Sequence, residues 1–195
     1  MPKESKREER RRQRRRQRRR GYLIWGGIGL LVLIGAGWLV ARALQPAAGE
    51  AAPLMEATHI AEGTDPGAYS TDPPTSGLHY PAEYDAKFYE EEDLAGLAPF
   101  HEGYLVHNLE HGYVIFWYNC AALASGECNE LKQGIRDVMD QFDGLKLIAF
   151  PRASLAEPLV MTSWGRLRRF EALDTRAAAD FIRRNRNRAP EPNAP

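Results

Sequence analysis

The feature that most limits how this chain can fold is an uncharged apolar stretch, Tyr22–Val40, which reads YLIWGGIGLLVLIGAGWLV. It contains no proline, and at about 1.5 Å per residue a helix of this length crosses a hydrocarbon core of roughly 30 Å. Tyr22 and Trp25 stand near one end and Trp38 near the other, where aromatic rings favour the membrane interface. The sequence therefore predicts one transmembrane helix over residues 22–42.

The charges on either side of this stretch predict its orientation. Residues 1–20 contain twelve Lys or Arg and three Glu, whereas residues 43–195 contain thirteen basic and twenty-three acidic residues. Because basic residues that flank a span stay in the cytoplasm, residues 1–21 are predicted to be a basic cytoplasmic tail of a single-pass cell-membrane protein, with the acidic body outside. We expect the tail to contact anionic lipid head groups, and we expect no nucleic-acid partner.

A cleaved signal peptide is the competing interpretation of the apolar stretch. Ala41-Arg42-Ala43 has the A-x-A form of a cleavage site. The stretch is longer than the apolar core of a usual signal peptide, however, and its basic flank is also long. We therefore favour an uncleaved anchor.

The residues beyond the span predict one extracytoplasmic globular domain. Residues 43–57 are rich in Ala, Pro and Gly and predict a flexible linker. Residues 58–191 can enclose a single core, and residues 192–195 are a tail. The element order (loop, short helix, strand, helix, strand, strand, helix) indicates an α+β fold with a small mixed or antiparallel sheet, two main helices, and helices on one side of the sheet. The predicted strands are 113–118, 145–150, 159–164 and 168–173, and the main helices are 127–142 and the segment from 175.

The segment Gly103–Tyr118, GYLVHNLEHGYVIFWY, joins a cluster of histidines to an apolar run. The run suits a strand that is covered on both faces. The first half places His107, Glu110 and His111 in the order H-x-x-E-H. On a helix, residues four apart have Cβ atoms about 5–6 Å apart and can hold one metal ion, whereas on a strand they would lie about 13 Å apart. Gly112 suits the position after a helix end, so we expect a short helix here.

These histidines predict a transition-metal site, because imidazole ligands suit Zn and Cu. We expect His107 and His111 to be ligands, with His79 on the rigid loop TDPPTSGLHY as the third and His59 as the next candidate. Glu110 would orient an imidazole through its other nitrogen. We expect no organic cofactor.

Two other interpretations of the histidines stay open. In one, the same side chains form a metal-free polar network that supports a surface for a protein partner outside the membrane. In the other, H-x-x-E-H belongs to an inverted zinc hydrolase, with the Glu as general base. Such enzymes need a large substrate cleft, for which a domain of this size leaves little room, so we assign no catalytic residue. Met161 offers a thioether for copper, but a core position is favoured for it.

Two cysteines, Cys120 and Cys128, follow the apolar run and enclose a short loop that contains Gly126. An extracytoplasmic position permits a disulfide. Two free thiols, or one soft metal ligand, are the alternatives. We favour a structural disulfide.

Four segments of the outer domain resemble a known family. They are DPPTSGLH (Asp72–His79), LVHNLEHGYVIFWY (Leu105–Tyr118), TSWGR (Thr162–Arg166) and FIRRNRNRAPE (Phe181–Glu191). Together they resemble the bacterial domain of unknown function 3105, which often follows an N-terminal membrane anchor. The family has no established activity, so the resemblance implies no mechanism, and the cysteine pair is not part of its pattern. The resemblance implies that the polar positions of the family are His59, His79, His107, Glu110 and His111.

Overall fold

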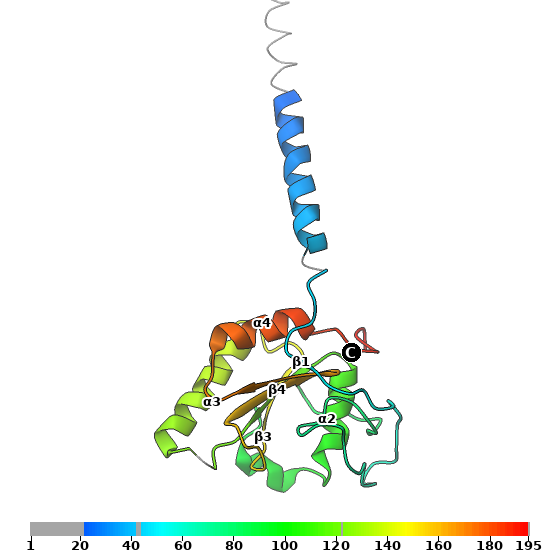
Figure 1. Ribbon diagram of the computed structural model, residues 1–195, viewed down its shortest axis with the longest axis vertical. Coiled ribbons are helices and arrows are strands. Elements are labelled where there is room, and N and C mark those ends of the chain that lie inside the picture. The colour runs from blue at the N-terminus through cyan, green and yellow to red at the C-terminus, as the bar shows by residue number, and fades with distance from the viewer. Residues whose placement is uncertain (1–21, 42–43, 122, 195) are drawn as a thin grey trace, which may run out of the picture. The chain divides into compact units, whose positions relative to one another are not determined.

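The computed structural model of the chain describes residues 22–41, 44–121 and 123–194 (Figure 1). Its contacts divide the chain after Gln45 into two compact units. The first unit holds the helix Tyr22–Ala41, the one helix among the described residues that is long and apolar enough to cross a membrane. None of the residues in its most apolar stretch is buried. A signal sequence would fit the same description. The predicted basic tail, residues 1–21, lies outside the described residues.

The second unit is built on a mixed sheet, to which the described residues contribute five strands. β2 and β3 run parallel, and the other neighbouring strands are antiparallel. Because parallel neighbours need a long crossover, the helix α3 (Ser125–Asp140) lies between β2 and β3 in the chain. A mixed sheet with helices confirms the predicted α+β fold. In spatial order the strands are β1 (Glu50–Ala51), β5 (Arg166–Phe170), β4 (Leu159–Ser163), β2 (Val114–Tyr118) and β3 (Leu147–Pro151).

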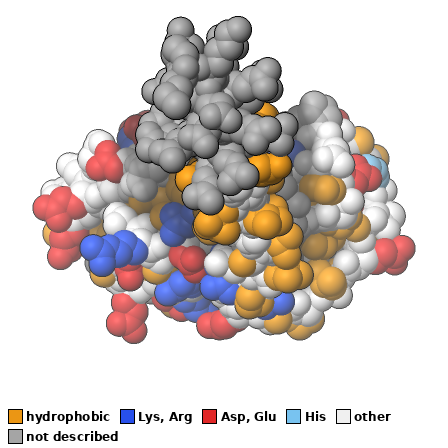
Figure 2. Space-filling model, turned by 90° about the horizontal axis from the view of Figure 1, so that it is seen from above, with side chains coloured by type: hydrophobic (Ala, Val, Ile, Leu, Met, Phe, Trp, Pro, Cys, Tyr) orange, Lys and Arg blue, Asp and Glu red, His pale blue; other side chains and the backbone are white. Residues whose placement is uncertain are grey.

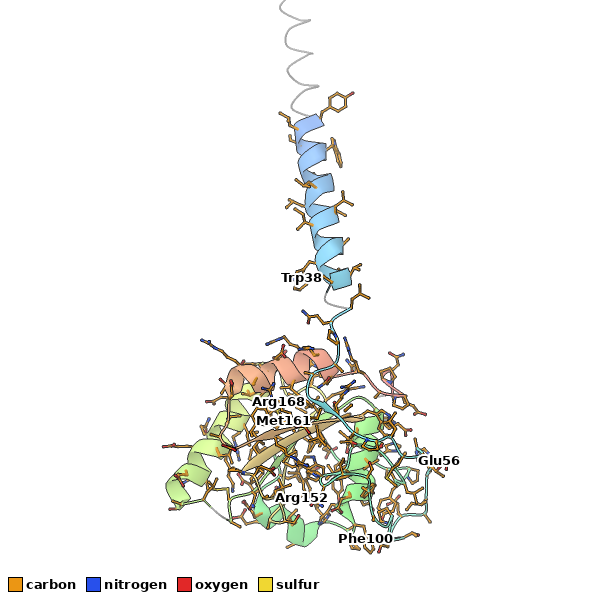
Figure 3. The ribbon with its side chains drawn as sticks, viewed as in Figure 1. Trp38, Glu56, Phe100, Arg152, Met161 and Arg168 are labelled. Atoms are coloured by element: carbon orange, nitrogen blue, oxygen red, sulfur yellow. A yellow bond between two sulfur atoms is a disulfide. The ribbon has the colours of Figure 1, made fainter. Side chains whose placement is uncertain are left out.

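Helices cover both faces of the sheet, which corrects the expectation of helices on one side (Figure 1). The main helices α3 and α4 (Thr175–Asn185) pack on one face, against side chains such as Phe116. The short helix α2 (His101–Glu110) packs on the other face, against side chains such as Ile115. The apolar side chains of a helix show that it packs on a sheet, but they do not show on which face. Met161 (Figure 3) lies in the core between the sheet and helices α3 and α4. This is the core position that was favoured for it over a role as a copper ligand.

The strand β2, which lies between β4 and β3, joins the two layers. All five of its residues are buried, as an apolar run covered on both faces predicts. Because side chains alternate along a strand, Phe116 and Tyr118 enter the α3–α4 core, whereas Ile115 and Trp117 enter the α2 core. Each large apolar side chain buried in this way contributes roughly 1.5–3 kcal/mol. The position of α2 is therefore fixed by the same strand that anchors α3 and α4.

Part of the segment predicted as a flexible linker, residues 43–57, is ordered on the domain. Glu50 and Ala51 pair with β5. Ala48 is buried, and its N–H and C=O both bond to the side-chain amide of Asn185, each at 3.0 Å. The local composition gives no sign of these contacts, because the partner residues lie more than a hundred positions away in the chain.

Short segments cover both edges of the sheet. At one edge the two-residue strand β1 pairs with β5. At the other edge Phe88 forms a bridge with Ala149 of β3. There the Tyr89 N–H donates to the Ala149 carbonyl at 2.8 Å, and the Ala149 N–H donates to the Lys87 carbonyl at 3.1 Å. Part of the backbone edge of β5 and part of that of β3 are thus satisfied.

The long connection between β1 and α2 contains only the 3-10 helix η1 (Glu91–Gly96) and isolated bridges, yet its PPTSG segment is fixed. Residues 73–77 are buried. The Thr75 carbonyl accepts a hydrogen bond from the Gly165 N–H at 3.0 Å, which ties the loop to the turn between β4 and β5. The segment is thus held as firmly as a core element, in agreement with the rigid loop that its prolines predict.

Helix α2 meets this connection at a glycine. The Tyr80 N–H donates to the Gly103 carbonyl at 3.1 Å, and the Tyr80 side chain is fully buried. A Cβ added at Gly103 would lie 2.4 Å from the nearest atom of the Tyr80 ring. The absence of a side chain at Gly103 therefore permits the close contact that places α2 beside the loop.

Arg152 links the loop, α2 and the end of β3 (Figure 3). Its guanidinium lies 2.6 Å from the carboxylate of Asp72 and 2.6 Å from that of Glu102. Burial acts to raise the pKa of Glu102, but the hydrogen bond and charge of Arg152 outweigh it and hold the pKa below its usual range.

On the face shown in Figure 2, basic and acidic side chains are interspersed among apolar ones.

Cys120 and Cys128 are joined by a disulfide, with their Cα atoms 5.3 Å apart. The bond ties the residues that follow β2 to the first turn of α3. It therefore closes a small ring at the start of the crossover between β2 and β3.

We expect Gly103→Ala to lower the free energy of unfolding of the domain by about 1–3 kcal/mol, because the buried Tyr80 ring must shift. Gly126→Ala in α3 is the matched control, since a Cβ there meets nothing within 4 Å and alanine favours helices. Urea unfolding followed by tryptophan fluorescence compares the two variants. Equal stability of the variants would contradict the close packing at Gly103.

Removal of the disulfide by Cys120→Ser with Cys128→Ser should lower the free energy of unfolding by about 2–3 kcal/mol, the loop-closure term for a ring of this size. Thermal unfolding with and without reductant measures the effect. Reductant should lower the melting temperature of the wild type and leave that of the double variant unchanged. A wild type that is fully reduced, as checked by thiol titration, and melts at the same temperature would contradict this expectation.

Candidate functional site

His79 is the most deeply buried histidine of the domain, with 1% of its side chain exposed. It follows the PPTSG segment, whose burial fixes the backbone on its N-terminal side. Its Nδ1 lies 2.8 Å from the carbonyl oxygen of Gly77. A carbonyl can only accept a hydrogen bond, so Nδ1 carries a proton and donates it to Gly77. In the neutral ring, Nε2 is then the nitrogen with a free lone pair.

His59 is placed beside His79 by the backbone. The two residues form a parallel bridge, in which the Ile60 N–H donates to the His79 carbonyl at 2.8 Å and the His79 N–H donates to the Thr58 carbonyl at 3.2 Å. The ring centroids of His59 and His79 are 4.7 Å apart. Half of the His59 side chain is exposed, so this ring forms the solvent side of the cluster.

The third segment is the helix α2. It ends at Glu110, shortly before Gly112, which confirms the short helix predicted to end at this glycine. His111 caps the helix, and Gly112 has a φ of 85°, the left-handed conformation that commonly ends helices. A Cβ at Gly112 would lie 2.7 Å from the Cα of Asn187. The glycine thus lets the segment after α4 pack against the end of α2, where the Asn187 N–H donates to the Gly112 carbonyl at 2.9 Å.

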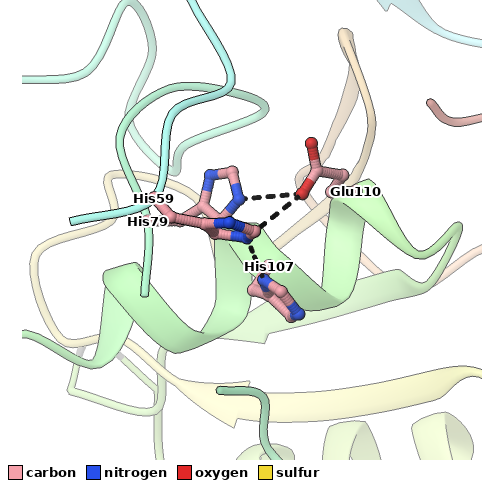
Figure 4. A group of neighbouring side chains, drawn as sticks. All are labelled: His59, His79, His107 and Glu110. Carbon is pink, nitrogen blue, oxygen red and sulfur yellow. Dashed lines mark hydrogen bonds and ion pairs between the residues drawn. The ribbon is translucent and has the colours of Figure 1, made fainter. Parts of the chain in front are cut away.

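These three segments bring together four side chains, which we call the first histidine group: His59, His79, His107 and Glu110 (Figure 4). Their ligand atoms all lie within 4.8 Å of one another. Glu110 Oε2 is 2.8 Å from His79 Nε2 and 3.9 Å from His59 Nε2. His59 Nε2 is 3.2 Å from His107 Nδ1. The structure therefore brings three of the four histidines expected as ligands to one point.

Glu110 contacts a different nitrogen from the one expected for an orienting group. An orienting carboxylate bonds to the nitrogen that does not bind the metal. Here the Gly77 carbonyl occupies His79 Nδ1, and Glu110 faces Nε2, the nitrogen with the lone pair. The carbonyl of Gly77 thus has the orienting position, and the carboxylate of Glu110 is itself among the candidate ligand atoms.

His111, the fourth expected ligand, turns toward another carboxylate. Its Nδ1 lies 2.9 Å from Glu83 Oε2, and with His107 these two residues form a second cluster of ligand atoms within 4.8 Å of one another. We call Glu83, His107 and His111 the second histidine group. Glu83 was not among the residues that the sequence singled out, and neither its spacing nor its neighbours in the chain distinguish it from a surface acid.

His101 lies outside both groups. Its Nδ1 is 3.2 Å from the hydroxyl of Tyr84, and its ring packs near that of Phe150. Burial lowers its pKa. His101 is therefore a structural histidine at the start of α2, although it lies within the histidine-rich segment of the sequence.

The charge state of His107 suits a metal ligand. Burial lowers its pKa, and repulsion from three neighbouring imidazoles lowers it further, to about 4. A ring with this pKa is neutral near neutral pH, so a lone pair is available for a metal ion. His107 is also the one residue that belongs to both histidine groups of the described chain.

The donor atoms of the first histidine group fit a transition-metal ion. Three imidazoles and one carboxylate are a set of ligands that zinc and copper accept. Four tetrahedral donors at about 2.0–2.1 Å from zinc lie about 3.3 Å from one another. Three of the six donor separations, 2.8, 3.2 and 3.9 Å, bracket this value, and all six are within 4.8 Å, so the donor atoms are close enough together for side-chain shifts to admit one ion.

The four sequence segments that resemble a family contact one another in pairs in the structure. The PPTSG and TSWGR segments meet through the bond between Thr75 and Gly165, and the C-terminal segment meets the end of α2 through the bond between Asn187 and Gly112. The comparisons with curated proteins and with solved structures gave no match. Residues 59–195 match the family described as "Protein of unknown function (DUF3105)". Because this match covers more than half of the chain, the protein belongs to the DUF3105 family.

Proposed function

We propose that this protein binds a transition-metal ion, Zn²⁺ or Cu²⁺, in a domain that is held outside the cell membrane by one N-terminal helix. The ligands of the ion are His59, His79 and His107, with Glu110 as the fourth. One observation carries the proposal: two atoms that both bear lone pairs, His79 Nε2 and Glu110 Oε2, face each other at 2.8 Å in a buried place.

Such a pair of acceptors needs a cation between its members. The proton of His79 is already committed to the Gly77 carbonyl through Nδ1, so Nε2 of the neutral ring has nothing to donate to the carboxylate. Either a proton lies between the two atoms, on the imidazole or on the carboxyl group, or a metal ion binds both atoms. His59 and His107 add two more nitrogens within reach of the same point. A lone ion pair has no need of these extra nitrogens, and a metal ion does, so they favour the metal.

The ligand set also restricts the metal. Nitrogen-rich sites suit Zn²⁺ and Cu²⁺, whereas Mg²⁺ and Ca²⁺ prefer oxygen ligands. Cu⁺ favours sulfur ligands, but Cys120 and Cys128 are bonded to each other and Met161 lies in the core. The half-exposed ring of His59 gives the ion a route from solvent to the buried ligands.

The location of the domain is part of the proposal. The apolar helix has the length of a membrane span, and the basic residues before it favour a cytoplasmic N-terminus. A disulfide persists in oxidising compartments, which supports an outer position for the domain. The basic tail, in turn, has the composition of a segment that contacts anionic lipid head groups.

We expect the full-length chain, purified in detergent with a tag that contains no histidine, to hold at least one Zn²⁺ or Cu²⁺ ion per chain by elemental analysis. His79→Asn and Glu110→Gln should each lower the metal content by one ion, because each removes a buried ligand. His101→Asn is the matched control and should retain the full content, since His101 lies outside both groups.

Chelation provides a second measurement of the same site. At a metal concentration about 100 times the dissociation constant, binding stabilises the folded state by about 2.7 kcal/mol, so removal of the metal should lower the melting temperature by roughly 5–10 °C. A metal-free chain whose melting temperature changes neither with chelator nor with added Zn²⁺ or Cu²⁺ would refute the proposal. It would leave His79 and Glu110 as an ion pair in a protein-interaction domain.

The uncleaved anchor is tested by fractionation. The intact mass should include the residues before Gln45, and the chain should stay in the membrane fraction after alkaline carbonate washing. Leu31→Arg with Leu33→Arg should weaken insertion, because an arginine at the centre of a span costs about 2.5–3.5 kcal/mol. A released protein that begins just after Ala43 would instead identify the segment as a signal peptide.

A further inference from the structure

His107 stands between two sets of ligand atoms. Its Nδ1 faces His59 in the first histidine group at 3.2 Å. Figure 4 shows its other ring nitrogen turned away from that group. His107 is also a member of the second histidine group: the ring centroid of His111 lies 4.2 Å from that of His107, and His111 in turn contacts Glu83.

The carboxylate of Glu83 is held in place by a buried amide. The Asn108 side chain accepts a hydrogen bond from the Tyr84 N–H at 3.1 Å and donates to the Tyr84 carbonyl at 2.9 Å, which fixes the residue next to Glu83. The same amide nitrogen lies 3.5 Å from Glu83 Oε2. Asn108 is fully buried in α2. The second group is therefore positioned by the same helix that supplies ligands to the first.

Negative charge gathers around His111. Glu83 Oε2 lies 2.9 Å from its Nδ1, and Glu191 Oε2 lies 3.7 Å from its Nε2. The Glu191 backbone is fixed there, because its N–H donates to the Glu110 carbonyl at 3.0 Å. The nearby cation Lys146 is engaged by backbone carbonyls, one of them that of His111 at 2.9 Å. Only 10% of the His111 side chain is exposed, compared with 30% for Glu83 and 57% for Glu191, so a buried imidazole lies beside two partly exposed carboxylates.

We infer that Glu83, His107 and His111 form a second metal site, so that the domain holds two transition-metal ions joined through the imidazole of His107. This inference rests on the proposed function, because the first ion occupies the site already described. A neutral imidazole has only one nitrogen without a proton. To bind both ions, His107 must therefore release its remaining ring proton to solvent and act as an imidazolate bridge. Glu191 is the nearest further oxygen for the second ion.

The test counts ions. The full-length chain in detergent is equilibrated with a slight excess of Zn²⁺, desalted, and measured by elemental analysis. The wild type should hold two ions per chain. His111→Asn and Glu83→Gln should each hold one, and His107→Asn should hold none firmly. Glu130→Gln, at an exposed position on α3, and His101→Asn are the matched controls and should hold two.

The number of ions per chain shows which of the two proposed sites is wrong, if either is. A wild type with one ion, or two ions retained by both His111→Asn and Glu83→Gln, would overturn the second site and leave the first intact. A wild type with no ion would overturn the proposed function itself. The use of two variants on different segments guards against loss of folding in one of them, and circular dichroism of each variant checks that it is folded.

A Cu²⁺-loaded sample gives an independent readout of the bridge. Two Cu²⁺ ions that share an imidazolate are magnetically coupled, so the electron paramagnetic resonance signal at low temperature should correspond to fewer than two isolated spins per chain. In His111→Asn the signal should correspond to one uncoupled Cu²⁺. Two full, uncoupled spins in the wild type would exclude His107 as a shared ligand.

Discussion

The structure depends on the burial of β2 from both sides. A strand with polar residues on one face could be covered by α3 and α4 alone, and α2 would then have no surface to pack on. Because Ile115 and Trp117 are as apolar as Phe116 and Tyr118, a second layer must cover them. Helix α2 supplies that layer through Leu105 and its neighbours and thereby presents its other side to the PPTSG loop. The histidine site thus forms on the outer side of a helix whose inner side is required by the core.

The two histidine groups combine a rigid helix with two pieces of loop. Such a site needs precise backbone positions in segments that lack regular structure, and the fold provides them through single contacts. The bridge between His59 and His79 aligns the loop strands, and the Gly103 contact with Tyr80 brings them against α2. An ion bound there would connect residues that are about fifty positions apart in the chain. In this respect it resembles the disulfide, but it is a reversible link.

Local patterns in the sequence predicted most helices and strands. The features that these patterns missed depend on contacts between residues that are far apart in the chain. The apolar periodicity of α3 and the run in β2 are properties of short segments, so their positions followed within a few residues. The strand β1 could not be seen, because Glu50 and Ala51 depend on β5. The four-residue spacing of His107 and His111 predicted a shared helix face. It could not show which way each ring turns, since that is decided by partners such as Glu83 from the preceding loop.

The covered edges of the sheet bear on how neighbouring copies behave. A strand with a free edge offers backbone groups to any other exposed strand. The two residues of β1 and the bridge at Phe88 are too short to strengthen the core much. They occupy the positions at which a second sheet would begin to pair. They therefore reduce the length of backbone edge that is open to pairing with another strand.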